Sequence, residues 1–127
     1  CPNKPFQEID YNIIKKMIDV NITAPIMLIN LLKNNIEQII NINSMSGLES
    51  KKNRTIYAAT KWGFKGFSES LKKEENTYAI LDVYPTNIRT WPERKNAMNV
   101  DFVVKKIYSS MISKDKELIL DGRINDY

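Results

Sequence analysis

Apolar and polar positions follow two patterns along the chain, one typical of helices and one typical of buried strands. Apolar residues recur on one stripe of the segment 9–34, which predicts a long amphipathic helix. The stripe consists of Ile13, Ile14, Met17 and Ile18. Three shorter runs of β-branched and apolar residues, at 38–44, 78–84 and 118–120, predict buried strands.

The same patterns predict two further helices. One runs from about residue 55 to residue 74, and Gly63 and Gly66 lie inside it. Each glycine costs a helix about 1 kcal/mol relative to alanine, so we interpret the pair as room for another backbone to approach. The apolar contacts of this helix are Trp62, Phe64, Phe67 and Leu71. Asp101 is predicted to cap the last helix, whose inward face consists of Phe102, Val103, Ile107 and Met111.

The alternation of helices and strands predicts an α/β fold with a parallel sheet. At 127 residues, 43% hydrophobic and 27% charged, the chain is typical of one globular unit. The longest apolar stretch, residues 24–32, is interrupted and too short to cross a bilayer. We therefore expect no membrane partner.

Cysteine and histidine usage excludes several kinds of site. A single cysteine allows neither an internal disulfide nor a cysteine cluster for zinc, and histidine is absent. Histidine-based hydrolase triads and most zinc chemistry are thereby excluded, so we predict no metal site. No leader segment is recognisable, and a reducing, cytoplasmic setting is expected.

Positive charge is in excess, with a net charge of +4. It is densest at Lys51–Lys52–Asn53–Arg54, a run that is typical of phosphate or nucleic-acid binding or of a solvated loop. No aromatic residues interleave with the basic ones, and Glu49 dilutes the charge. We favour the loop and expect no nucleic-acid partner.

Candidate chemistry centres on Tyr57 and Lys61, four residues apart in a predicted helix. Residues at that spacing share one helix face, where an ammonium favours the ionised form of a neighbouring acid. Ser44 ends a predicted strand thirteen residues earlier, and ligands bind at the carboxyl ends of strands in open α/β sheets. The three side chains predict a proton-transfer site. Tyr11 and Lys15 repeat the spacing without a preceding strand or serine, so we interpret them as a solvated pair.

Pro25 falls inside the predicted long helix. Because proline has no N–H, the carbonyl of Asn21, four residues earlier, loses its helical hydrogen bond. The Asn21 carbonyl is then available to another partner. A simple kink that fits core packing is the alternative interpretation.

Four motifs in this order resemble those of the short-chain dehydrogenase/reductase family, over roughly residues 8–90. Residues 40–47 (Ile-Asn-Ile-Asn-Ser-Met-Ser-Gly) and residues 57–61 (Tyr-Ala-Ala-Thr-Lys) match its catalytic segments, and Gly63, Gly66 and Phe67 follow. Residues 20–25, with Asn21 and Pro25, resemble its asparagine segment. Residues 85–90 resemble its proline-glycine-x-valine-x-threonine loop.

The resemblance implies an NAD(P)-dependent oxidoreductase that transfers a hydride between a nicotinamide and a small carbonyl or alcohol substrate. Tyr57 would be the general acid/base, and Ser44 would polarise the substrate oxygen, with Ser46 a weaker candidate for that role. Lys61 would bind the nicotinamide ribose, and Asn21 would anchor a water relay. The cofactor, NADP or NAD, would contact Tyr57, Lys61, Pro85, Thr86, Ile88 and Thr90. A homodimer or homotetramer built through the long helices is also implied.

The resemblance further implies a Rossmann-like doubly wound parallel sheet. We expect this chain to be its C-terminal portion, about three parallel strands with flanking helices, in a single partial domain over residues 1–127. Cys1 would fall just after the family's fourth strand. The glycine-rich turn that holds the pyrophosphate in the family has no counterpart among the four glycines. A non-catalytic truncated module for dimerisation or partner binding is therefore the alternative function.

Three details modify this picture. Thr86 takes the place of the family's usual glycine, and a β-branched residue resists positive φ. The connection 91–100 is short, which predicts an open pocket that Trp91 either lines or flanks by packing at its edge. We identify no chemistry in the tail from Gly122 onward.

Overall fold

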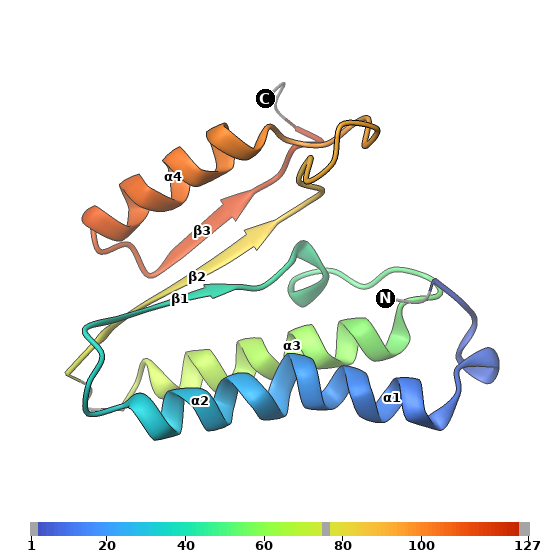
Figure 1. Ribbon diagram of the computed structural model, residues 1–127, viewed down its shortest axis with the longest axis horizontal. Helices are drawn as coiled ribbons and strands as arrows, with labels where there is room; N and C mark the ends of the chain where they lie inside the picture. Colours follow the sequence, from blue (N-terminus) through green and yellow to red (C-terminus); the bar gives the residue numbers. More distant parts are fainter. Residues whose placement is uncertain (1–2, 75–76, 125–127) are drawn as a thin grey trace.

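A parallel sheet of three strands forms the centre of the part of the chain that the computed structural model describes, residues 3–74 and 77–124 (Figure 1). Its strands are β1 (Gln38–Ile42), β2 (Ala79–Pro85) and β3 (Glu117–Leu120), in the order β1-β2-β3. Both pairs of neighbours are parallel. The α/β class and the three predicted parallel strands are confirmed, whereas Cys1 lies outside the described residues.

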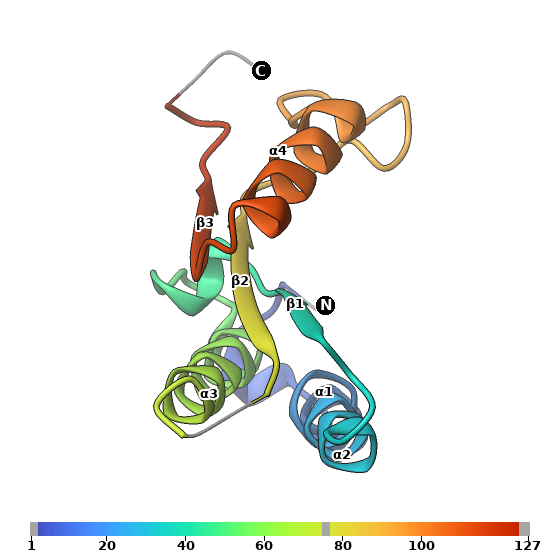
Figure 2. The ribbon, with the colours of Figure 1, turned by 90° about the vertical axis from the view of Figure 1, so that its left-hand side faces the viewer.

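Helices cover both faces of the sheet. On one face lie α1 (Tyr11–Ile18), α2 (Ala24–Leu32) and α3 (Thr55–Leu71), and on the other lies α4 (Val100–Ile112), as Figure 2 shows. This layered arrangement with parallel strands is the Rossmann-like architecture that was predicted. In the described residues, no helix is long and apolar enough to span a membrane.

The first predicted helix is not a continuous α-helix. Asp10 caps it by accepting a hydrogen bond from Asn12 N at 2.8 Å, and α1 and α2 are joined by a π-helical segment, Asp19–Thr23. There the N–H of Ala24 donates to the carbonyl of Asp19, five residues earlier. Pro25 cannot donate to the Asn21 carbonyl, and the wider π turn accommodates that loss. The proline therefore changes the type of helix at Asn21.

The hydrophobic core lies between the sheet and α4. It consists of the buried residues Leu81, Val83, Met98, Val103 and Leu120. Strand residues alternate between faces, so odd-numbered positions of β2 enter this core and even-numbered positions face α3. The predicted inward residues of α4 pack against the core: Phe102, Val103, Ile107 and Met111.

The cap of α4 differs from the prediction. Asn99, one residue before the helix begins, accepts hydrogen bonds from Asp101 N at 2.8 Å and Phe102 N at 3.4 Å. Asp101 is instead in the first turn, where its charge complements the helix dipole. The prediction that Asp101 is the cap was wrong because the helix begins at Val100, one residue beyond Asn99.

A polar seam joins α3 to the sheet. Asp82 on β2 is 1% exposed, and its carboxylate accepts hydrogen bonds from Ser68 Oγ at 2.8 Å and from Lys72 Nζ at 2.5 Å. Asn41 on β1, paired with Asp82 in the sheet register, donates to Asp82 at 2.8 Å and to Ser68 at 3.1 Å. The burial of these groups is balanced by hydrogen bonds, so the seam fixes α3 across two strands.

Helix α3 ends at Leu71, three residues earlier than predicted. A Cβ added at Gly63 would lie 3.1 Å from Ile22 Cδ1, whereas one added at Gly66 would meet nothing within 4 Å. No backbone approaches either glycine within the described chain. Trp62, predicted to make apolar contacts, is 47% exposed. The outer face of α3 is thus partly apolar and open.

Candidate active site

A cavity of about 330 Å³ opens beyond the carboxyl ends of β1 and β2. Six of the predicted site residues line it: Ser44, Tyr57, Pro85, Thr86, Ile88 and Thr90. The remaining lining comes from Ile42, Asn43, Met45, Ser46, Lys51, Arg54, Asn87, Arg94, Asn96, Gly122 and Arg123. Residues that follow β1, begin α3, follow β2 and follow β3 therefore converge on one space. Asn21 and Lys61 are not among the lining residues.

Ser44 lies just past the end of β1. Its extended backbone, with φ −170° and ψ 155°, begins a single 3-10 turn over Met45–Gly47, and its Oγ accepts a hydrogen bond from Ser46 N at 3.2 Å. The hydroxyl proton is left available to donate toward the cavity. A Cβ at Gly47 would lie 3.2 Å from the Lys61 carbonyl, so glycine allows this turn to approach α3. Ser46 also lines the cavity and is almost fully buried.

Tyr57 belongs to the first turn of α3, which begins at Thr55. Its ring lies between two cations: Lys61 Nζ is 5.6 Å from the ring centroid and Arg54 Cζ is 5.8 Å from it. Both distances fall within the range of cation–π interactions. The phenol is half-buried and contributes to the cavity wall.

Lys61 lies one turn beyond Tyr57, behind the cavity wall. Burial lowers the pKa of its ammonium below the ordinary 10.5, because desolvation disfavours the charged form. The carbonyl of Lys61 accepts a hydrogen bond from Asn43 Nδ2 at 3.2 Å. Through Asn43, the strand end that presents Ser44 is tied to the helix that presents Tyr57.

Asn21 reaches the site through an intermediary. Its Nδ2 donates to Thr60 Oγ1 at 3.1 Å, and the Thr60 hydroxyl donates to the Tyr57 carbonyl at 2.8 Å. Thr60 is 1% exposed. No role was predicted for Thr60, although a hydroxyl between the tyrosine and the lysine on the buried side of a helix was a usable signal.

Thr86 does not have the positive φ that would strain a β-branched residue at this position. The non-glycine residues with positive φ are Asn53, Asn96 and Lys114 within the described chain. Thr86 Oγ1 accepts a hydrogen bond from Gly122 N at 2.9 Å, and its backbone N–H donates to the Leu120 carbonyl at 2.9 Å. Thr86 therefore fastens the end of β2 to the end of β3.

The loop after β2 is closed by Arg94. Its guanidinium donates to the Ile88 carbonyl at 3.1 Å and to Asn87 Oδ1 at 3.4 Å. It also lies 5.2 Å from the ring centroid of Trp91, which is 56% exposed and does not line the cavity. Of the two interpretations of Trp91, edge packing describes its position.

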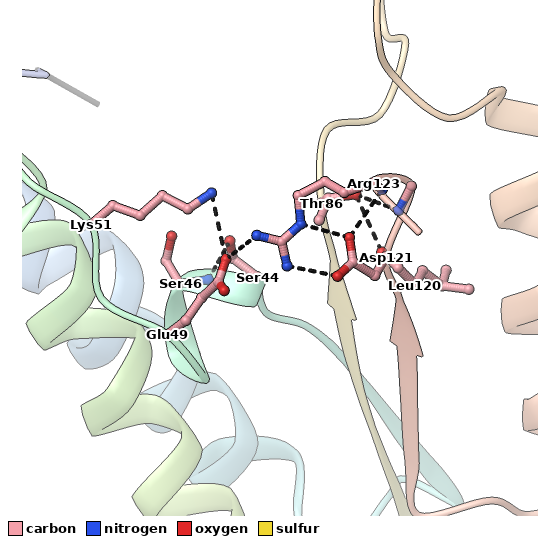
Figure 3. A network of polar contacts seen from close by, with 9 residues as sticks. Ser44, Ser46, Glu49, Lys51, Thr86, Leu120, Asp121 and Arg123 are labelled. Carbon is pink, nitrogen blue, oxygen red and sulfur yellow. Dashed lines mark hydrogen bonds and ion pairs between the residues drawn. The ribbon is translucent and has the colours of Figure 1, made fainter. Parts of the chain in front are cut away.

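An ion-pair network borders the cavity between the end of β3 and the loop after β1 (Figure 3). Arg123 binds both carboxylate oxygens of Asp121, at 2.7 and 2.6 Å, and Glu49 Oε1 at 2.6 Å. Lys51 Nζ lies 3.5 Å from Glu49 Oε1. The hydrogen bonds from Arg123 lower the pKa of the Asp121 and Glu49 carboxyl groups. This role of the tail was not predicted, because Arg123 and its partner Glu49 are 74 residues apart.

Comparison with known proteins gives a consistent picture. The family model described as short chain dehydrogenase matches residues 1–99. Trans-4-hydroxycyclohexanecarboxylate dehydrogenase from Sinomonas cyclohexanicum is 41% identical over 54 residues, which are 41% of this chain and 21% of that protein. Human dehydrogenase/reductase SDR family member 7C is 32% identical over 102 residues, covering 72% of this chain and 33% of the relative.

Solved structures share the fold. A 4-hydroxyisoleucine dehydrogenase complexed with NADH superposes with a TM-score of 0.82 at 22% identity, over 95% of this chain and 63% of that one. At this identity the likeness concerns the fold alone. The chain spans one fifth to about one third of the length of the curated relatives just described.

Proposed function

Because the chain belongs to the short-chain dehydrogenase family, a family of oxidoreductases, we propose that it carries the proton-transfer site of an NAD(P)-dependent dehydrogenase or reductase. The observation that supports this proposal most strongly is the cavity shared by Ser44, Tyr57, residues 85–88 and Thr90. The cavity brings together a hydroxyl, a phenol and the loop after β2. It lies at the carboxyl edge of the sheet, where ligands bind in such folds. The reaction would interconvert an alcohol and a carbonyl compound.

Tyr57 would transfer the proton. In reduction its hydroxyl donates to the substrate's carbonyl oxygen, and in oxidation the phenolate accepts the proton of the alcohol. Ser44 would donate a hydrogen bond to the same oxygen and polarise the carbonyl. Lys61, close to the Tyr57 ring, would favour the anionic phenolate by its positive charge.

Asn21 and Thr60 would act through Tyr57. Their hydrogen bonds hold the first turn of α3 against the π segment. This contact limits the freedom of the Tyr57 backbone and therefore of the phenol that reaches the substrate. The proposed role of Asn21 as the anchor of a water relay rests on the absence of a proline N–H four residues later.

The lining is chemically suited to the nicotinamide end of the cofactor. The hydroxyl groups of Ser44 and Tyr57 share the cavity with the apolar side chains of Pro85 and Ile88, a mixture typical of cofactor sites. Lys61, Thr86 and Thr90 would complete the binding set, with NAD or NADP as the cofactor. When bound, the nicotinamide supplies the hydride in reduction and accepts it in oxidation.

A titration tests the cofactor proposal directly. NADH and NADPH are added to the folded chain while nucleotide fluorescence and protein fluorescence are followed. Saturable binding that Tyr57→Phe and Lys61→Met weaken, and that Lys114→Met in the turn after α4 leaves unchanged, would support the proposal. A folded chain that binds neither nucleotide argues against the proposal and in favour of the alternative, a non-catalytic module.

We also propose that copies of the chain associate through α2 and α3 as a homodimer or homotetramer. Apolar side chains are exposed on these helices: Met27, Leu28, Leu31 and Trp62. Gly66 offers an open position on the same helix as Trp62. Light scattering during size exclusion tests this proposal, because Leu31→Asp should lower the measured mass and Val104→Asp, on α4, should not.

A further inference from the structure

The charge of the cavity is one-sided. Four cationic side chains line it, Lys51, Arg54, Arg94 and Arg123, and no carboxylate is present among the described residues of the lining. An apolar or neutral substrate has no need of such a wall. Clustered cations raise the local concentration of anions and favour anionic ligands.

The four cations are not equivalent. Arg123 and Lys51 are paired with Glu49, and Arg123 also with Asp121. Arg94 is engaged by the Ile88 carbonyl. These three positive charges are therefore partly committed to the protein itself.

Arg54 is different. Its guanidinium has no carboxylate partner in the part of the chain that the structure describes, and it lies 5.8 Å from the centroid of the Tyr57 ring. It occupies the N-cap position of α3, three residues before Tyr57, and the 5.8 Å distance brings its guanidinium next to the Tyr57 ring. An anion bound to Arg54 is thus next to the group proposed to move the proton.

We propose that the substrate carries a carboxylate, which Arg54 binds through its planar pair of N–H donors while Arg94 contributes positive charge. The substrate class is then a hydroxy acid and the corresponding oxo acid. This inference rests on the proposed function and specifies a group of the substrate that does not react, its carboxylate. Arginine suits the task because its donors match the two oxygens of a carboxylate.

The reaction balances without a further reagent. In oxidation the hydroxyl carbon of the acid loses a hydride to the nicotinamide of the dinucleotide, and the hydroxyl proton passes to Tyr57. The C–O single bond becomes a double bond, and the carboxylate keeps its charge. Binding that charge on Arg54 would orient the reacting carbon relative to the phenol.

Matched small molecules test the inference on the chain itself. Levulinate carries a ketone and a carboxylate, and methyl levulinate has the same skeleton without the charge. We follow the Arg54 side-chain N–H and the Tyr57 ring signals by NMR during each titration. Levulinate should bind about tenfold or more tightly than the ester, and added salt should weaken only the acid.

Variants identify the residue responsible. Arg54→Gln should lose most of the preference for the acid while leaving ester binding unchanged. Arg89→Gln makes the same change of charge at an arginine outside the lining and should retain the preference. If Arg54→Gln does not fold, Arg94→Gln should still show a smaller loss of preference.

The outcomes separate the two proposals. Equal affinities for acid and ester, or a preference that survives in both Arg54→Gln and Arg94→Gln, would overturn the carboxylate site. Inorganic phosphate that displaces levulinate at equal concentration would also overturn it, in favour of a phosphate site. Acid preference in a chain that binds no NADH supports the carboxylate site and counts against the proposed dehydrogenase function alone.

Discussion

Asn21 and Thr60, 39 residues apart in the chain, are joined by a 3.1 Å hydrogen bond between two helices. Thr60 in turn donates to the carbonyl of Tyr57 at 2.8 Å. A buried hydroxyl is thereby used twice, once as acceptor and once as donor. The π segment and the first turn of α3 consequently form a single structural unit around the phenol.

Replacing Thr60 by valine should destabilise the chain. The substitution keeps the shape but leaves Asn21 Nδ2 and the Tyr57 carbonyl without this partner, at a cost of about 1–3 kcal/mol. Urea unfolding followed by circular dichroism measures the change, and Thr60→Ser, which retains the hydroxyl, should lose much less. Equal stabilities of the serine and valine variants would contradict this account.

Removing the Asp82 carboxylate should have a larger effect. Asp82→Ala leaves the half-buried Lys72 ammonium, at present 2.5 Å from the carboxylate, with no counter-ion, and breaking a buried pair costs about 3–5 kcal/mol. Lys15→Ala breaks an exposed ion pair with Asp19 and should cost less than about 1 kcal/mol. The difference in urea midpoint between the two variants is the measurement.

Lys61 should titrate below the ordinary lysine pKa of 10.5. Burial lowers its pKa from 10.5, so the folded state releases this proton at a lower pH than the unfolded state does. Its contribution to the free energy of unfolding therefore rises with pH between the lowered pKa and 10.5 and is constant outside that window. NMR of ¹³C-methylated lysines, with Lys61→Arg to assign the signal, should show the earlier titration; an unshifted signal would refute it.

The Arg123 network should respond to acid. Its hydrogen bonds lower the pKa of Asp121 and Glu49 in the folded state, so both carboxylates stabilise the fold at neutral pH. That contribution is lost as the pH falls through the lowered pKa values. Arg123→Gln should unfold more easily than the wild type at pH 7, and the difference should shrink towards pH 3. A difference independent of pH would mean that the ion pairs are not its source.

Two glycines should respond to alanine with opposite signs. A Cβ at Gly122 would lie 2.6 Å from Met98 Cγ, inside the core boundary, and overpacking of this kind costs about 1–3 kcal/mol. Gly66 meets nothing within 4 Å, so alanine should stabilise α3 by about 1 kcal/mol. Thermal unfolding at low protein concentration measures both changes apart from any association.

The strands were predictable because their signal is local. β-branched runs at β1 and β2 reflect burial on both faces of a parallel sheet, and a serine or a proline marks the end of each run. The gathering of Ser44, residues 85–88 and Thr90 around one cavity follows from that topology. Family motifs added the expected chemical roles, which remain proposals for this chain.

Other features depended on distant or competing interactions. Asn99 and Asp101 are both good capping residues, and only the start of the helix at Val100 decides between them. The pairing of Arg123 with Glu49 spans 74 residues, so no local sequence pattern predicts it. Thr60 is buried because α3 packs against the π segment. The sequence periodicity of either helix alone does not predict this contact.

The π segment also determines how α2 is rotated about its axis relative to α1. Each residue of an α-helix turns the chain by about 100°, so the extra residue accommodated at Asp19–Thr23 rotates α2 relative to α1 by roughly that angle. A deletion of one residue there would remove this rotation and turn Asn21 away from Thr60, while Pro25 would still lack an N–H to donate. This stretch of helix therefore cannot change its length by a single residue without uncoupling α1 and α2 from the phenol.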